Sequence, residues 1–154
     1  LLENDYPKMG LANFPILKKY YYSDSVNSYC CNNKKKKIRT SKQTKIEKSK
    51  LVTNSMHTFK SKKKFNFFKN YKFFFKISGV DAYNFCLLAE GKIDLVVESG
   101  LKSYDVLPLV SLIENAGGII TDWKGSKNFE KGEILAAANK ILHSKFLEYF
   151  RSKI

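Results

Sequence analysis

The stretch "DLVVESGLKSYDVLPLVSLIENAGG", residues 94–118, carries the clearest secondary-structure pattern of this chain. Residues 95–97 form a continuous apolar run, which is typical of a strand buried on both faces. From residue 103 onward, apolar residues recur at helical spacing, and the pattern ends on a pair of glycines. A buried strand followed at once by an amphipathic helix predicts a layered α/β arrangement.

Two carboxylates flank the turn between this strand and this helix. Glu98 ends the strand and Asp105 opens the helix. Ligands of layered α/β proteins bind outside the carboxyl ends of strands, which makes both residues candidates for a site. The alternative is structural, because a carboxylate in a first helical turn is favoured by the helix dipole and Asp105 then acts as an N-cap.

A second helix start lies upstream, in "SGVDAY", residues 78–83. A glycine lets a ligand approach the backbone, and the first residues of a helix present free N–H groups. We expect both helix starts and the strand end to face one pocket that takes an anionic or hydroxylated ligand and a hard cation. The predicted substrate-binding residues of this pocket are Gly79, Val80, Asp81, Ala82, Glu98 and Asp105.

The rest of the chain divides into two regions. Residues 1–56 read as a meander of short strands with polar breaks, in which Lys34–Lys37 reads as a solvated hairpin tip. Residues 57–154 read as an α/β half, with strands near 71–78, 92–98, 119–123 and 133–139. Helices are expected near 59–70, 82–91, 103–118 and 140–153. The predicted fold class is therefore α/β with mixed layers.

Composition favours a protein without a nucleic-acid or membrane partner. The 154 residues carry a net charge of +14, but only Arg39 and Arg151 among the 28 basic residues are arginine, the side chain preferred for phosphate and base contacts. The abundance of Lys, Asn, Ile, Phe and Tyr fits a codon bias better. No apolar run reaches the length of a membrane span. The three cysteines show no metal-binding spacing, which favours reduced thiols and a cytoplasmic location.

The two histidines have no partner motif. His57 follows a predicted strand, and His143 lies in the predicted terminal helix. A nucleophilic histidine would need an orienting partner. We expect surface or packing roles for both.

The segment "SGVDAYNFCLLAEGKIDLVVESGLKSYDVLPLVSLIENAGGIITDWKG" resembles the C-terminal half of the inositol monophosphatase family. It is most similar to the histidinol-phosphate phosphatase branch, on the form of "GVDAY", the "LKSYD" lead-in and "VLPLV". The first 56 residues follow the family's strand meander more weakly. The resemblance implies a partial layered sandwich, in which an antiparallel meander precedes an α/β half with a mixed sheet.

The resemblance also implies roles for the residues of the pocket. Asp105 corresponds to a catalytic, metal-ligating aspartate that also contacts the substrate, and Glu98 to a substrate-side carboxylate. Residues 79–82 correspond to a loop that lines the substrate pocket. The implied cofactor is Mg²⁺, the implied substrate is a small phosphorylated metabolite, and the complete enzyme is expected to form a homodimer. Histidinol phosphate is the favoured substrate, with inositol phosphate or a 3′(2′),5′-bisphosphate nucleotide as alternatives.

The sequence departs from the family where most of the metal is held. The family's other ligands are a glutamate and an Asp-Pro-Ile-Asp-Gly-Thr motif, and neither occurs in the 154 residues. One aspartate is too few for a Mg²⁺ site. We therefore expect the C-terminal two-thirds of a phosphate monoesterase, inactive alone. The alternative from another class is a non-catalytic remnant that binds RNA or other anions through Lys34–Lys37 and residues 62–64.

Overall fold

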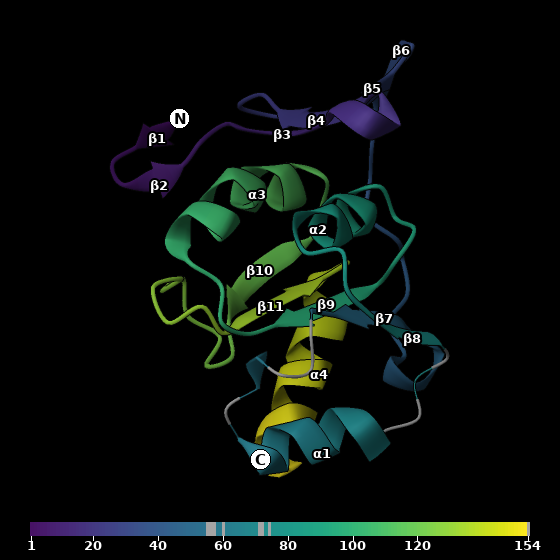
Figure 1. The fold of residues 1–154 in the computed structure, drawn as a ribbon, viewed down its shortest axis with the longest axis vertical. Coiled ribbons are helices and arrows are strands. Elements are labelled where there is room, and N and C mark those ends of the chain that lie inside the picture. The colour runs from purple at the N-terminus through teal and green to yellow at the C-terminus, as the bar shows by residue number, and fades with distance from the viewer. Residues whose placement is uncertain (55–57, 60, 71–72, 74, 154) are drawn as a thin grey trace.

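The computed structural model describes residues 1–54, 58–59, 61–70, 73 and 75–153. Its secondary structure forms layers stacked along the long axis (Figure 1). An antiparallel sheet lies at one end, helices α2 and α3 lie beneath it, and a mixed sheet follows, with helix α4 against its far face and helix α1 beyond, beside α4. The layered α/β arrangement predicted from the sequence is confirmed.

The N-terminal region is an antiparallel meander, as predicted. A short hairpin of β1 and β2 precedes a sheet in which each strand pairs with the next, in the order β3-β4-β5-β6. A single 3₁₀ turn, Pro15–Leu17, links β3 to β4. The bounds are β1 (Leu2–Glu3), β2 (Tyr6–Pro7), β3 (Gly10–Phe14), β4 (Lys19–Ser23), β5 (Ser28–Asn32) and β6 (Lys34–Lys37).

The lysine run Lys34–Lys37 is a strand, and its prediction as a hairpin tip is wrong. The tip is Asn33, which has a φ of +59°, and β6 pairs with β5 from Asn32↔Lys34 to Tyr29↔Lys37. All four lysines are exposed. A strand of charged side chains at a sheet edge opposes pairing with another chain, which explains how lysines occupy this position.

The second sheet is mixed, with the strand order β10-β11-β9-β7-β8. Strand β7 runs parallel to β8 and β9, whereas β11 is antiparallel to β9 and β10. Strand β7 falls within the predicted region 1–56 but pairs in this second sheet. The bounds are β7 (Lys50–Thr53), β8 (Phe75–Ser78), β9 (Leu95–Glu98), β10 (Ile119–Asp122) and β11 (Ile134–Ala137). A 3₁₀ turn, Ile46–Lys48, leads into β7.

The helices occur where their periodicity predicts them. Their bounds are α1 (Lys62–Asn70), α2 (Ala82–Ala89), α3 (Ser103–Asn115) and α4 (Lys140–Lys153). Strand β9 separates two hydrophobic cores, because Val96 joins the cluster under α2 and α3 while Leu95 and Val97 join the cluster under α4. This alternation confirms that the apolar run of β9 is buried on both faces.

The antiparallel sheet is fixed to α2 and α3 by its inner face. Ser23 and Ser111 hydroxyls are hydrogen-bonded at 2.7 Å, and the Ser28 hydroxyl donates to the Leu112 carbonyl at 2.7 Å. At Gly10 the backbone approaches α3 so closely that a Cβ atom would lie 1.8 Å from the Pro108 carbonyl oxygen. The antiparallel sheet therefore packs directly against helix α3, through hydrogen bonds and close backbone contact.

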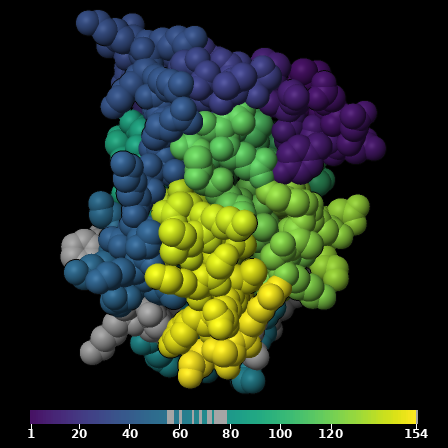
Figure 2. All heavy atoms as spheres, turned by 180° about the vertical axis from the view of Figure 1, so that it is seen from behind, coloured from purple at the N-terminus to yellow at the C-terminus, as the bar shows by residue number. Residues whose placement is uncertain are grey.

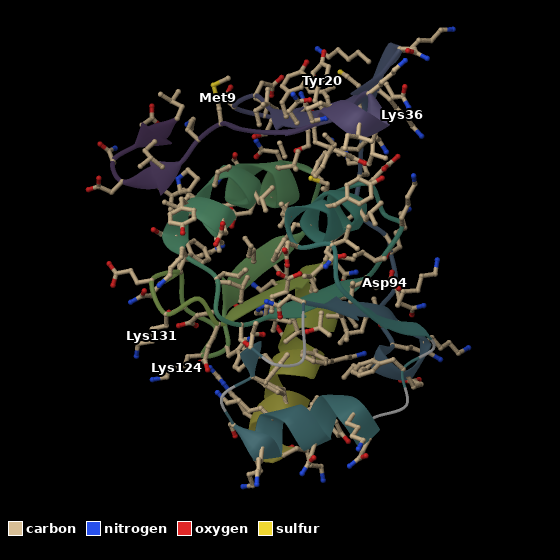
Figure 3. All side chains as sticks on the ribbon, viewed as in Figure 1. Met9, Tyr20, Lys36, Asp94, Lys124 and Lys131 are labelled. Carbon is tan, nitrogen blue, oxygen red and sulfur yellow. The ribbon has the colours of Figure 1, made fainter. Side chains whose placement is uncertain are left out.

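The outer face of the same sheet carries aromatic and apolar side chains toward solvent. Met9 and Tyr20 lie on this side (Figure 3), and Tyr20 and Leu11 are 43% and 60% exposed. The rings of Tyr22 and Tyr29 stack at 5.1 Å, with the Lys35 ammonium 4.0 Å above Tyr29. Seen from behind, this sheet forms the upper end of the molecule and α4 forms the lower surface (Figure 2).

Three further expectations can be compared with the structure. Cys30, Cys31 and Cys86 are free and buried. His143 is buried and packs with its Nε2 2.8 Å from the Thr121 hydroxyl, which confirms a packing role, while His57 lies outside the described residues. Among the helices of the described part of the chain, none has the length and hydrophobicity needed to cross a bilayer.

Candidate active site

Glu98 is a carboxyl group buried at the carboxyl end of β9. The three preceding residues are fully buried, so the strand carries Glu98 into the interior, where it is 0% exposed. Its Oε1 accepts a hydrogen bond of 2.9 Å from the Asn84 amide. Its Oε2 has no hydrogen-bond partner among the described residues. A buried oxygen without a partner is costly, and it marks a position where a ligand group can bind.

The turn before α2 is strained and open. Gly79, Val80 and Asp81 all have positive φ, at +116°, +77° and +36°. This conformation is unusual for a β-branched residue such as Val80, and strain of this kind concentrates at functional sites. A Cβ atom at Gly79 would have nothing within 4 Å, so the backbone there is accessible.

The same turn offers backbone donors. In α2 the first intrahelical bonds are donated by the amides of Tyr83 and Asn84, to the carbonyls of Val80 and Asp81. In the described structure the N–H groups of Val80, Asp81 and Ala82 have no partner. Free amides at a helix N-terminus bind anionic or hydroxyl oxygens.

Asp105 is not the N-cap of α3, contrary to the structural alternative from the sequence. The helix begins at Ser103, which makes Asp105 the third helical residue. Its Oδ2 accepts a hydrogen bond of 2.8 Å from the Lys102 N–H, so the carboxylate reaches back over the helix start. The side chain is exposed and can contact a ligand.

The charges at both helix starts act on the Glu98 carboxyl. Burial raises the pKa of Glu98 to about 8, although the hydrogen bond from Asn84 opposes the rise. The negative charges of Asp81 and Asp105 raise the pKa further. Both helix starts are thus close enough to Glu98 to act on its charge. A protonated Glu98 can donate a hydrogen bond from Oε2, which suits a hydroxyl or alkoxy oxygen of a ligand.

The described residues do not form a complete site for a divalent cation. Within residues 1–54, 58–59, 61–70, 73 and 75–153, no three His, Cys, Asp or Glu side chains are grouped so that they can hold a metal ion. Asp81 and Asp105 are the exposed carboxylates of the site, whereas Glu98 is buried and favours its neutral form. Mg²⁺ takes six oxygen ligands in octahedral geometry, and the side chains of the described residues alone do not supply a group that fits it.

Two features of the site were missed in the sequence. Asn84 was read as part of an apolar helix, and the signal for its role was its polarity between Tyr83 and Phe85. The second feature is a network at the strand ends, in which the Asn54 amide donates to the Ser99 carbonyl at 2.7 Å. The Ser99 hydroxyl donates to Thr58 at 3.0 Å, so this network ties the end of β7 to the end of β9.

A hollow of about 490 Å³ lies beside these groups. It is lined by the residues that connect Glu98 to Asp105, namely 99–102, and by Thr58, Glu130, Lys131 and Glu133. The two carboxylates themselves are not part of its wall. It adjoins the candidate site through residues 99–102, which form part of its lining.

The chain has a layered α/β fold, and its candidate site lies between the carboxyl end of a strand and two helix starts. Comparison with known proteins identifies the family to which the chain belongs. The inositol monophosphatase family model matches residues 1–154, and this chain belongs to that family.

Individual relatives agree with this assignment. The bifunctional phosphatase IMPL2, chloroplastic, of Arabidopsis thaliana is 35% identical over 96% of this chain and 45% of its own length. A solved inositol monophosphatase from Zymomonas mobilis has a TM-score of 0.85 at 32% identity, over 96% of this chain and 59% of that one. The histidinol-phosphatase of Chlorobaculum parvum is 29% identical over 40% of this chain. The chain thus spans about half of its first curated relative.

Proposed function

We propose that the residues around Glu98 and Asp105 bind the alcohol side of a phosphate monoester in a Mg²⁺-dependent phosphatase. The observation that carries the proposal is the unpartnered, buried Oε2 of Glu98 beside the free amides of the α2 start. Membership of a family of phosphomonoesterases supports the reaction class. Hydroxyl recognition would use Glu98 and residues 79–82, while Asp105 would lie nearest the ester.

The metal is part of the proposal. We infer that Asp105 supplies one Mg²⁺ ligand and that the other ligands come from residues outside the described set. When bound, Mg²⁺ supplies charge stabilisation at the phosphate oxygens. The chain's own contribution is to place a carboxylate at the start of α3, held by the Lys102 N–H.

Inositol monophosphate is the substrate that the comparisons favour over the histidinol phosphate predicted from the sequence. The Zymomonas mobilis structure, named as an inositol monophosphatase, matches 96% of this chain. Histidinol phosphate is the second candidate, because a histidinol-phosphatase matches the chain at 29% identity over 62 residues. A homodimer stays a prediction, as do a cytoplasmic location and the RNA-binding alternative. The Arabidopsis relative is named as chloroplastic.

The experiment joins residues 1–154 to the part of the Zymomonas mobilis enzyme that lies outside the match. Phosphate release is measured with Mg²⁺ on inositol 1-phosphate, histidinol phosphate and a 3′,5′-bisphosphate nucleotide. We expect turnover to be fastest on inositol 1-phosphate. Asp105→Asn should lower turnover at least ~100-fold, because it removes the proposed metal-ligating carboxylate. Each tenfold loss of rate corresponds to about 1.4 kcal/mol of activation free energy. The exposed Asp5→Asn is the control. Unchanged turnover in Asp105→Asn would reject the assignment of this residue.

A further inference from the structure

Asn84 joins three elements of the candidate site through a single side chain. It lies in the first turn of α2 and is 1% exposed. Its Nδ2 donates two hydrogen bonds, to the Gly79 carbonyl at 2.7 Å and to Glu98 Oε1 at 2.9 Å. The helix, the strained turn before it and the end of β9 are thereby connected.

Asn84 is a polar side chain in an apolar environment. Its neighbours Phe85 and Cys86 are buried in the core, at 1% and 0% exposure. A carboxamide there costs free energy unless its donors are satisfied. Both N–H donors are satisfied by groups of the site and not by the helix itself, which offsets the cost of burying the carboxamide.

Each acceptor has a geometry that needs holding. The Gly79 carbonyl begins a turn with three consecutive positive φ values, which leaves the amides of Val80 and Asp81 without partners. The Glu98 carboxyl has two oxygens, and bonding Oε1 fixes the rotamer that leaves Oε2 unpartnered. The Asn84 amide therefore holds in place both the turn that carries the free backbone N–H groups and the Glu98 carboxyl that carries the unpartnered oxygen.

We propose that Asn84 is a positioning residue, which holds the Gly79–Asp81 turn and the Glu98 carboxyl together in the arrangement that meets the ligand. Asn84 itself does not contact the ligand. The identity of that ligand rests on the proposed function, but the positioning does not. Loss of the amide would release the turn toward ordinary negative φ values and free the Glu98 carboxyl to rotate.

The test uses NMR without substrate, on residues 1–154 carrying Leu11→Lys, a change of an exposed residue in β3 that charges this sheet edge and opposes self-association. Asn84→Asp has nearly the same shape and replaces both N–H donors by an oxygen. We expect the φ-dependent coupling constants of Val80 and Asp81 to move to values for negative φ. We also expect the Glu98 carboxyl resonance to titrate at higher pH, because a hydrogen bond is lost and a carboxylate joins those of Asp81 and Asp105.

The control is Asn115→Asp at the far end of α3, where the amide donates to the Asp24 carbonyl at 2.8 Å. It makes the same chemical change at a distance from the site and should leave both readouts unmoved. Unchanged coupling constants and an unchanged Glu98 titration in folded Asn84→Asp would overturn the proposal.

A second variant keeps the proposal testable if Asn84→Asp does not fold. Asn84→Ser is smaller, retains a polar atom and cannot reach both acceptors, so the same movement of both readouts is expected. If φ at Val80 and Asp81 is retained in Asn84→Ser, the positioning role is wrong. Failure of phosphate release in the joined protein would reject the proposed function alone, because neither readout here involves turnover.

Discussion

At the scale of single residues, Glu98 ties the stability of the chain to pH. Its burial, with the charges of Asp81 and Asp105, raises its pKa to about 8 from an ordinary value of 4.5. The folded state holds the proton of the Glu98 carboxyl more tightly than the unfolded state does. The contribution of this protonation to the stability of the folded chain is therefore complete below the pKa that Glu98 has in the unfolded chain. It is lost as the pH rises through the folded pKa.

Glu98→Gln should remove this dependence. The glutamine keeps an oxygen for the Asn84 amide and never ionises, so the variant should gain melting temperature relative to the native chain between about pH 5 and about pH 8. Thermal unfolding followed by circular dichroism at several pH values measures the difference. Glu148→Gln, on the exposed side of α4, controls for the lost charge. A difference independent of pH would show that Glu98 is ionised in the folded chain.

At the scale of elements, Glu90 joins the antiparallel sheet to the end of α2. Its Oε2 accepts hydrogen bonds of 3.0 Å from Lys19 and 2.8 Å from the Tyr21 hydroxyl. The Lys19 and Glu90 side chains are both 11% exposed. Burial alone would raise the pKa of Glu90, but the bonds from Lys19 and Tyr21 outweigh it and lower the pKa. The stabilisation is thus present at neutral pH and lost in acid.

Glu90→Ala should lower the free energy of unfolding by about 3 kcal/mol, because it leaves the nearly buried ammonium of Lys19 without its Glu90 partner. Glu90→Gln should cost less, since it retains an acceptor for Tyr21. Urea unfolding measures both. The exposed pair of Lys8 and Glu3 provides the control, and Glu3→Ala should cost below about 1 kcal/mol. Equal losses of unfolding free energy in Glu90→Ala and Glu3→Ala would mean that the contacts of Glu90 with Lys19 and Tyr21 do not stabilise the packing of the sheet on α2.

Sequence patterns predicted these elements where hydrophobic periodicity was strong. Strand β9 and helix α3 followed directly from their apolar residues, and so did the strand-end position of Glu98. Lys34–Lys37 has no apolar period, and only its pairing with β5 makes it a strand. The third-residue position of Asp105 depends on where the helix begins, and helix boundaries vary by a residue or two. The bonds of Asn84 to Gly79 and Glu98 depend on tertiary packing, which no local pattern contains.

At the scale of the whole molecule, the two edges of the antiparallel sheet differ. Strand β6 presents lysines, which oppose pairing with another chain, whereas β3 presents the uncharged sequence "GLANF". Leu11 of β3 is 60% exposed, and Leu1 and Leu2 at the start of the chain are 77% and 51% exposed. An uncharged edge next to exposed apolar side chains favours association between chains.

We expect residues 1–154 alone to self-associate at micromolar concentrations, on the order of those at which exposed strand edges aggregate. Leu11→Lys should shift the chain toward monomer by charging the β3 edge. Asn13→Ser, on the same strand and without a charge change, is the control. Light scattering across a dilution series measures the mass. A sharp, reversible melt of a monomer at all concentrations would contradict the expectation.

We propose that the turn 79–82, Glu98 and Asp105 together form one ligand site. The most direct measurement is an NMR titration of residues 1–154 carrying Leu11→Lys, which keeps the chain toward monomer, with inositol 1-phosphate in the presence of Mg²⁺. We predict saturable shifts of the amides of Val80, Asp81 and Ala82 and of residues 98–105, which Glu98→Ala abolishes. Shifts confined to the lysines of β6 and α1, or no shifts at residues 79–82, would contradict the claim.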